Sequence, residues 1–352
     1  MSKPRPLKLR ASLSKNFTFG VEFEFGLRFV KKPFSTPPKN WEFVKDTLMV
    51  ATGFEIMTDH EINDLDRHGP EDIHPSEEYK TWTIGSDSTL YFDDEKGKDL
   101  LEYIPIEMRS PVLKFNPDSL KEIHKMLTAL NTNFNVVVNR SCGLHVHVGN
   151  GTEGMSVEPL KHLMATIWIF ESQISSLLPK SRSLLSCHSA PLHQCSNLGV
   201  RGFEGDLLDV PFSPSTINEV VTMFEGYAKS FRLAYLIGGL RQPFDEPVKR
   251  TIEFRQHERT TDPETFMNWV SFVVELVVWA YKVRRQDLKI ILSDYLNQRE
   301  GYSVEYLFKE IGFPESTVKF YRIKVGRVEE AEKEEARREK ADRDAIGISS
   351  FS

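Results

Sequence analysis

Four short stretches of the chain alternate between apolar and polar residues with a period of two. They span residues 17–26, 103–109, 141–149 and 251–257. Because successive side chains of a β-strand point to opposite faces, such a stretch places its apolar residues on one face and its polar residues on the other. The pattern therefore predicts four strands of a sheet with one buried face and one ionic face.

The predicted ionic face carries almost only glutamate, histidine and arginine. Its residues are Glu22 and Glu24 in the first strand, Glu107 and Arg109 in the second, His145 and His147 in the third, and Glu253, Arg255 and His257 in the fourth. One such strand is ordinary, because a half-solvated sheet alternates in the same way. Four strands with the same residue types favour a functional site.

Helical spacing of apolar residues is found between and after these strands. It predicts helices over residues 41–51, 116–130, 156–178, 215–227, 262–285, 286–298 and 303–311. Asn116 and Asp262 are typical helix caps, because each is followed by a proline that suits the first turn. The other expected elements are a strand that enters a turn over 82–90, a strand over 230–240, an acidic surface excursion over 55–80, and an irregular segment over 179–214.

The interleaved strands and helices predict an α+β fold. We expect a curved, mainly antiparallel sheet, with helices packed on its apolar face and an open ionic face. Residues 1–15 are polar and are expected to form a disordered arm, and residues 16–326 a single catalytic domain. Residues 327–352 are expected to form a charged helix or tail, because little of this segment is apolar.

Composition narrows the possible partners and the compartment. The chain has 352 residues, of which 40% are hydrophobic and 27% charged, as in ordinary globular proteins. A formal net charge of -6 argues against a nucleic-acid or anionic-membrane partner. Three cysteines provide no disulfide framework, and the basic start of the chain lacks the apolar core of a signal peptide. We therefore expect a cytoplasmic protein.

The ionic face has a chemical requirement if its strands are neighbours. Its glutamates are Glu22, Glu24, Glu107 and Glu253. Carboxylates a few ångströms apart raise one another's pKa, and two divalent ions would relieve the repulsion. Carboxylate oxygens with one imidazole suit Mg²⁺ or Mn²⁺. Arg109 and Arg255 beside such ions would make a site for a polyanion such as a nucleoside triphosphate. The sequence has no glycine-rich phosphate loop, so metals and arginines would hold the nucleotide.

The motifs of the ionic strands resemble those of the amidoligase family. This family belongs to the carboxylate–amine ligase branch of the glutamine synthetase superfamily. The resembling segments are Gly20–Phe25, Glu107–Pro111, Cys142–Val148 and Thr251–Arg255, together with Trp82–Leu90 and Pro179–Arg182. They extend over residues 17–285. The segment 183–187 departs from the family pattern, in which a more polar run is expected.

The resemblance implies a glutamine-synthetase-like sheet that binds ATP and two or more Mg²⁺ or Mn²⁺ ions. It implies ATP-dependent joining of a carboxylate to an amine through an acyl phosphate, with an amino acid, peptide or small metabolite as substrate. The metal positions that it implies are Glu22, Glu24, Glu107, His145 and Glu253. The nucleotide-binding residues are expected to be Arg255, Arg109, Asp87 and His147, and the catalytic residues Arg255, Glu253 and Glu22.

Two other functions are compatible with parts of the sequence. His145 and His147, with Glu153 downstream, are near the facial triad of a cupin-type metal-dependent oxygenase. That interpretation leaves Glu22, Glu24, Glu253 and Arg255 without a role. The second alternative is a non-catalytic relative that binds a nucleotide or an amino acid and signals through its charged tail. Iron and oxygen dependence would favour the oxygenase, and Mg-ATP binding without turnover would favour the binding protein.

Overall fold

The computed structural model describes ten segments of the chain. They are residues 17–30, 41–68, 80–92, 101–151, 154–179, 189–202, 204–228, 232–242, 249–297 and 304–345. The expected arm over 1–15, most of the Pro179–Arg182 motif and Glu153 lie outside these segments. No helix of the described segments is long and apolar enough to cross a membrane.

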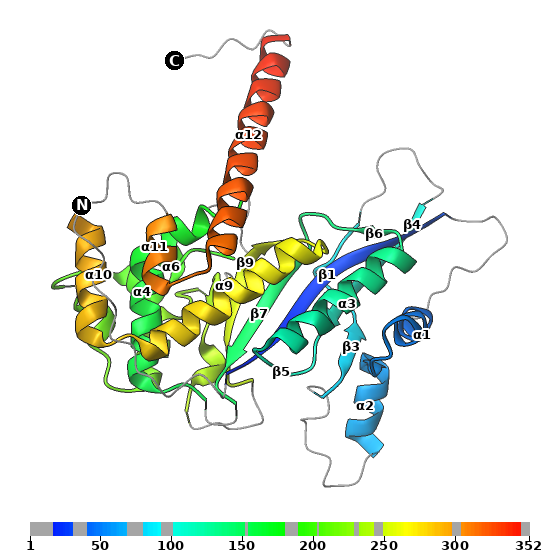
Figure 1. Ribbon diagram of the computed structural model, residues 1–352, viewed down its shortest axis with the longest axis horizontal. Coiled ribbons are helices and arrows are strands. Elements are labelled where there is room, and N and C mark those ends of the chain that lie inside the picture. The colour runs from blue at the N-terminus through cyan, green and yellow to red at the C-terminus, as the bar shows by residue number, and fades with distance from the viewer. Residues whose placement is uncertain are drawn as a thin grey trace.

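Nine strands of the described segments form one open sheet (Figure 1). Its spatial order is β2-β3-β4-β1-β7-β9-β8, and β5 and β6 each pair with β1. The strands are β1 (Thr18–Val30), β2 (Ile56–Thr58), β3 (Trp82–Gly85), β4 (Leu101–Arg109), β5 (Leu113–Lys114), β6 (Val136–Val137), β7 (Gly143–Gly149), β8 (Tyr235–Leu236) and β9 (Ile252–Glu258). In the part of the chain described, β2 and β3 are the one parallel pair. The predicted α+β class with a mainly antiparallel sheet is thus confirmed.

The helices of the described segments are α1 (Trp41–Thr52), α2 (Asp59–His68), α3 (Pro117–Asn133), α4 (Val157–Ser175), α6 (Leu192–Cys195), α7 (Asn197–Arg201), α8 (Ile217–Phe224), α9 (Pro263–Lys282), α10 (Arg285–Asn297), α11 (Val304–Ile311) and α12 (Glu315–Ala345), with 3₁₀ turns η2 (Val210–Phe212) and η3 (Gly238–Leu240). The seven predicted helices begin and end close to the predicted positions, whereas α2, α6 and α7 were not predicted and α12 begins before the predicted charged segment. The predicted caps are present. Asn116 accepts hydrogen bonds from two backbone N–H groups of α3, and Asp262 accepts one from Thr265 N–H of α9.

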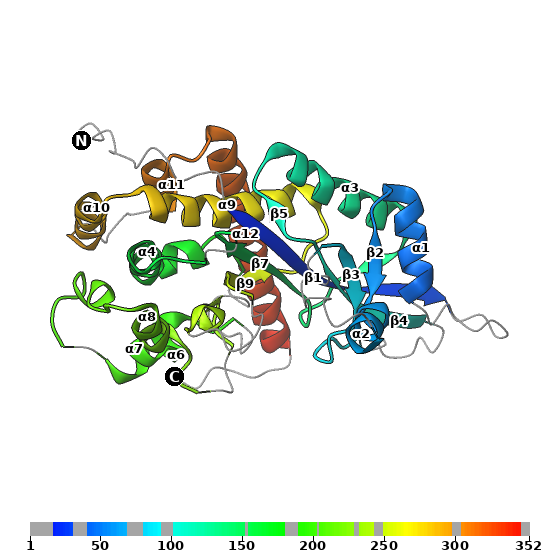
Figure 2. The ribbon, with the colours of Figure 1, turned by 90° about the horizontal axis from the view of Figure 1, so that it is seen from below.

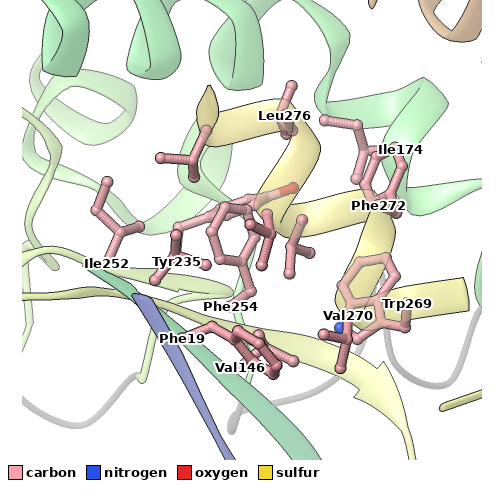
Figure 3. Packing of buried hydrophobic residues seen from close by; sticks show 14 of the residues in the cluster. Phe19, Val146, Ile174, Tyr235, Ile252, Phe254, Trp269, Val270, Phe272 and Leu276 are labelled. Carbon is pink, nitrogen blue, oxygen red and sulfur yellow. The ribbon is translucent and has the colours of Figure 1, made fainter. Parts of the chain in front are cut away.

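The apolar face of the sheet is covered by α3 and α9, which lie on the same side of it and contact one another (Figure 2). Figure 3 shows this packing from close by, with Val146 of β7 and Phe254 of β9 beside Trp269 and Val270 of α9. All four of these side chains are fully buried. Each large apolar side chain removed from water contributes about 1.5–3 kcal/mol, so this layer fixes the orientation of the strands. Their polar side chains are thereby directed to the opposite face.

Three expectations for individual segments are wrong in part. The segment 55–80 was expected to be an acidic surface loop, but its start belongs to the sheet. Ile56–Thr58 forms the edge strand β2, and Ile56 and Thr58 are buried. The strand expected over 230–240 is reduced to the two residues of β8, followed by the 3₁₀ turn η3 at a pair of glycines. The irregular segment 179–214 contains the short helices α6 and α7 and the turn η2.

A β-bulge in β9 overturns the expectation for His257. Leu144 of β7 pairs with His257, and two residues later Val146 pairs with Phe254, so β9 has one extra residue between these pairs. Because an extra residue inverts the alternation of sides, His257 turns away from the ionic face and into the core. Its ring is fully buried and lies 4.9 Å from that of Trp269 on α9.

The long helix α12 is attached through its first half. Val318 and Tyr321 are buried in the core, and Lys324 Nζ lies 3.0 Å from His257 Nε2 and 3.1 Å from Glu258 Oε1. Beyond this point the helix projects away from the body of the molecule (Figure 1). These contacts of α12 precede the charged segment that begins at residue 327.

Candidate active site

The register of the central strand brings the ionic residues of three strands together. Glu22 of β1 pairs with Arg109 of β4 on one side and with His145 of β7 on the other. Two residues further along β1, Glu24 pairs with Glu107 of β4. Residues directly opposite in an antiparallel pair have their Cβ atoms about 4.5–5.5 Å apart, so their side chains are in contact on the shared face.

The fourth strand adds a glutamate and an arginine to this face. Glu253 of β9 pairs with His147 of β7. Arg255 lies at the bulge, and its guanidinium contacts Glu253 Oε1 and lies 3.5 Å from His145 Nδ1. Arg255 and both histidines are buried. The structure thus joins β4, β1, β7 and β9 into one ionic face, as the alternation predicts.

A first cluster of possible metal ligands is formed by Glu22, His147 and Glu253. One ligand atom from each lies within 4.8 Å of the others. His147 Nε2 is 3.1 Å from Glu22 Oε1, and His147 Nδ1 is 3.2 Å from the hydroxyl of Thr251. A partner on one ring nitrogen fixes the orientation of an imidazole and leaves the other nitrogen for a ligand, as in metal-binding histidines generally.

A second cluster is formed by Glu24, Asp87 and Glu107, again with ligand atoms within 4.8 Å of one another. Asp87 lies in the turn after β3, and its Oδ1 accepts a hydrogen bond of 2.6 Å from the backbone N–H of Thr89. Glu24 Oε2 accepts one of 2.5 Å from the backbone N–H of Gly143, where β7 begins. These backbone donors orient two of the three carboxylates toward the third.

The pKa of Glu107 shows the electrostatic cost of the second cluster. Burial is the main cause that raises this pKa, and the nearby Glu22, Glu24 and Asp87 raise it further. Arg109 opposes them, and the resulting pKa is about 7. A carboxyl group with this pKa is half-protonated at neutral pH, and a divalent cation would hold it in the charged form.

Glu22 of the first cluster and the neighbouring His145 titrate differently from Glu107. Burial acts to raise the pKa of Glu22, but His147, His145 and Lys249 outweigh it and hold this pKa well below its usual value. Burial lowers the pKa of His145. Since a metal ligand must be a neutral imidazole and a charged carboxylate, Glu22 and His145 both have the protonation state that metal binding needs.

The two histidines of β7 lie at different places relative to the first cluster. The sequence predicts His145 as a metal ligand and His147 as a nucleotide contact, and the structure places His147 among the three residues of the first cluster. His145 Nδ1 lies 3.5 Å from Glu22 Oε2 and 3.7 Å from Glu253 Oε1, between the cluster and Arg255. The other expected ligands, Glu24 and Glu107, belong to the second cluster together with Asp87.

Two residues of the site are missed by the sequence reasoning. Asp59, the first residue of α2, contacts the guanidinium of Arg109, whose Nε lies 4.0 Å from Glu107 Oε2. Lys249, just before β9, contacts Glu22 Oε1. The sequence has a signal for Asp59, because Gly85 in the buried strand β3 marks a close approach. A Cβ at Gly85 would lie 2.5 Å from Asp59 Cγ, so only glycine leaves room for the Asp59 carboxylate.

The donor sets fit hard divalent cations. The first cluster offers two carboxylates and one imidazole, and the second offers three carboxylates. Oxygen-rich sets of this kind suit Mg²⁺ or Mn²⁺, whereas a structural zinc site uses Cys and His.

Comparison with known proteins places the chain in a family. A family described as putative amidoligase enzyme matches residues 15–277, about three quarters of the chain. The chain belongs to this family. The family description supports a ligase-type function, and the matched residues include both clusters and Arg255. No curated protein matches the chain.

One similar solved structure is a bifunctional glutathione synthetase from Pasteurella multocida. It is 13% identical, with a TM-score of 0.34, and the match covers 90% of this chain and 48% of that one. The amidoligase-family chain therefore spans about half the length of that structure.

The oxygenase alternative finds no support in the fold, because cupins are double-sheet jelly rolls and the sheet described for this chain is single and open.

Proposed function

We propose that this protein is an ATP-dependent carboxylate–amine ligase that forms an amide bond through an acyl phosphate. The observation that carries the proposal is the pair of carboxylate clusters on one face of the sheet, with Arg255 beside the first and Arg109 beside the second. Membership in the amidoligase family supports the same reaction class. We infer an amino acid, a peptide or another small metabolite as the carboxylate substrate.

The two clusters would hold the divalent ions. Glu22, His147 and Glu253 would bind one Mg²⁺ or Mn²⁺, and the second set of three carboxylates another. Such ions supply charge neutralisation for the triphosphate and polarise its γ-phosphoryl group. This assignment uses every carboxylate of the ionic face, so none of them is left as an uncompensated buried charge.

The residues of the chain would position the reacting groups. Arg255 is buried and is held by Glu253, so its guanidinium has a fixed direction from which it can donate hydrogen bonds to phosphate oxygens. Asp59 holds Arg109 in the same way at the second cluster. Preorganised donors of this kind stabilise the charge that develops during phosphoryl transfer.

The proposed reaction has two balanced steps. A carboxylate oxygen of the substrate attacks the γ-phosphorus of ATP, and the bond to the β-phosphate oxygen breaks, which gives an acyl phosphate and ADP. The amine then attacks the acyl carbon and loses a proton, and the carbon–oxygen bond to phosphate breaks. The products are the amide and inorganic phosphate.

The test is release of ADP and phosphate by the full-length protein with ATP, Mg²⁺ or Mn²⁺, and pooled amino acids and amines. The variant Glu253→Gln removes a proposed ligand. The variant Glu305→Gln is a matched control, because Glu305 also pairs with an arginine, Arg322, but at the surface. We expect release that depends on the pool, is lost in Glu253→Gln and is retained in Glu305→Gln. Tight Mg-ATP binding without release under any pool would favour a binding protein, and no nucleotide binding would contradict the proposal.

A further inference from the structure

Lys249 reaches the first cluster from the edge of the sheet. It lies three residues before β9, and its ammonium contacts Glu22 Oε1. The Lys249 side chain is 34% exposed, whereas that of Glu22 is 13% exposed. The lysine therefore extends from the solvent into a largely buried carboxylate.

The oxygen that Lys249 contacts is the one that faces the cluster. Glu22 Oε1 also lies 3.1 Å from His147 Nε2, and both groups belong to the first cluster together with Glu253. An ammonium at this oxygen and a divalent ion among the same ligands would be only a few ångströms apart. Their repulsion in a partly buried site is strong, because the screening there is much weaker than in water.

We propose that Lys249 is an internal counter-cation of the first cluster, which competes with the divalent ion for Glu22 and, when displaced, binds the nucleotide phosphate. The inference rests on the proposed function, because it takes the first cluster as a metal site. A lysine suits both positions, since it is a compact charge with three donors on a flexible stem. Arg255 contacts Glu253, another member of the same cluster, so both cations would be available to a phosphate bound there.

The test compares Mn²⁺ binding by wild type, Lys249→Met and Lys289→Met, measured as free Mn²⁺ by electron paramagnetic resonance without nucleotide. Lys289 is a matched control, because it also pairs with a carboxylate, that of Asp209, and its side chain is 37% exposed. We expect Lys249→Met to bind Mn²⁺ at least ~10-fold more tightly than wild type, since the competing charge is removed. Lys289→Met should bind as wild type does.

A second titration adds a non-hydrolysable ATP analogue at saturating Mn²⁺. Here we expect Lys249→Met to bind the analogue ~10-fold more weakly than wild type, because one phosphate contact is lost. Unchanged or weaker Mn²⁺ binding by a folded Lys249→Met protein, or unchanged analogue binding, would overturn the role of Lys249 and leave the ligase proposal intact. Absence of Mn²⁺ binding in both wild type and Lys249→Met would overturn both proposals, so the two failures are distinguishable without any assay of turnover.

Discussion

Replacing Gly85 by alanine should displace Asp59 and release Arg109 from its position beside the second cluster. The three atoms nearest to a Cβ at Gly85 all belong to the Asp59 carboxyl group, and the Cβ would lie 2.5 Å from its Cγ. Real Cβ atoms are essentially never found under 3.0 Å from such neighbours. The carboxylate must therefore move, and we expect its contact with the Arg109 guanidinium to break.

The size of the effect follows from the two groups involved. The side chains of Arg109 and Asp59 are 20% and 29% exposed, so their pair is only partly screened by solvent. A hydrogen bond between charged groups contributes about 1.5–3 kcal/mol, and forcing an extra methyl group into a packed site costs about 1–3 kcal/mol. Because the contributions overlap, we expect Gly85→Ala to lower the free energy of unfolding by about 2–4 kcal/mol.

The assay is urea denaturation, with Gly20→Ala as the matched control. Gly20 lies in β1 of the same sheet, and a Cβ there would meet its nearest atom, Ser110 Oγ, at 3.7 Å, an ordinary contact. We expect Gly20→Ala to change the free energy of unfolding by less than about 0.5 kcal/mol. In an Asp59→Ala background the nearest atoms are gone, so the cost of Gly85→Ala should fall by at least ~1 kcal/mol. Equal costs of Gly85→Ala in both backgrounds would refute the reasoning.

Three further predictions concern the charge, the chemistry and the tail. Burial above all raises the pKa of Glu107 from its usual value of 4.5 to about 7. Between pH 4.5 and pH 7 the native state therefore binds more protons than the unfolded state. In EDTA, the free energy of unfolding should therefore fall as the pH rises from 4.5 to 7, by up to about 3 kcal/mol, and urea denaturation of Glu107→Gln should show a smaller fall. Glu253→Gln and Arg255→Ala should each abolish ATP turnover with unchanged circular dichroism, and normal turnover in both would refute the site. Removal of residues 327–352 should leave turnover unchanged, because the contacts of Tyr321 precede the cut; a large loss would show that the tail helps to build the site.

The ionic face could be predicted because strand alternation is a local property. Each of the four stretches has an apolar side that must be buried, and this fixes the direction of its ionic side chains without any knowledge of the neighbouring strands. Glu22, Glu107, His145 and Glu253 therefore lie on one face, as the period of two predicts. Alternation does not give the strand order, and the division into two clusters follows from that order.

The position of His257 could not be predicted from the period of two. The bulge in β9 inserts one residue relative to β7. In the sequence, the polar and apolar residues on both sides of the bulge still alternate regularly. A bulge is a property of the pairing between strands, so a single stretch of sequence does not reveal it. Its consequence is that His257 packs against Trp269 and contacts Lys324 on α12.

Asp59 and Lys249 were missed for a related reason. Both lie outside the four alternating stretches, and each contacts a residue far away in the sequence, Arg109 for Asp59 and Glu22 for Lys249. An aspartate in an acidic segment and a lysine before a strand are ordinary surface residues by composition. Only Gly85, a glycine inside a buried strand, indicated that another group approaches the sheet at this point.

The central claim is that a carboxylate is activated by phosphoryl transfer, and oxygen transfer tests it most directly. The full-length protein is incubated with ATP, Mg²⁺, an amine and a carboxylate pool that carries ¹⁸O in both carboxyl oxygens, and the released phosphate is analysed by mass spectrometry. Because the acyl phosphate loses its bridging oxygen to phosphate, we predict one ¹⁸O atom in each phosphate formed. Amide formation with unlabelled phosphate, or release of AMP and pyrophosphate, would contradict the account.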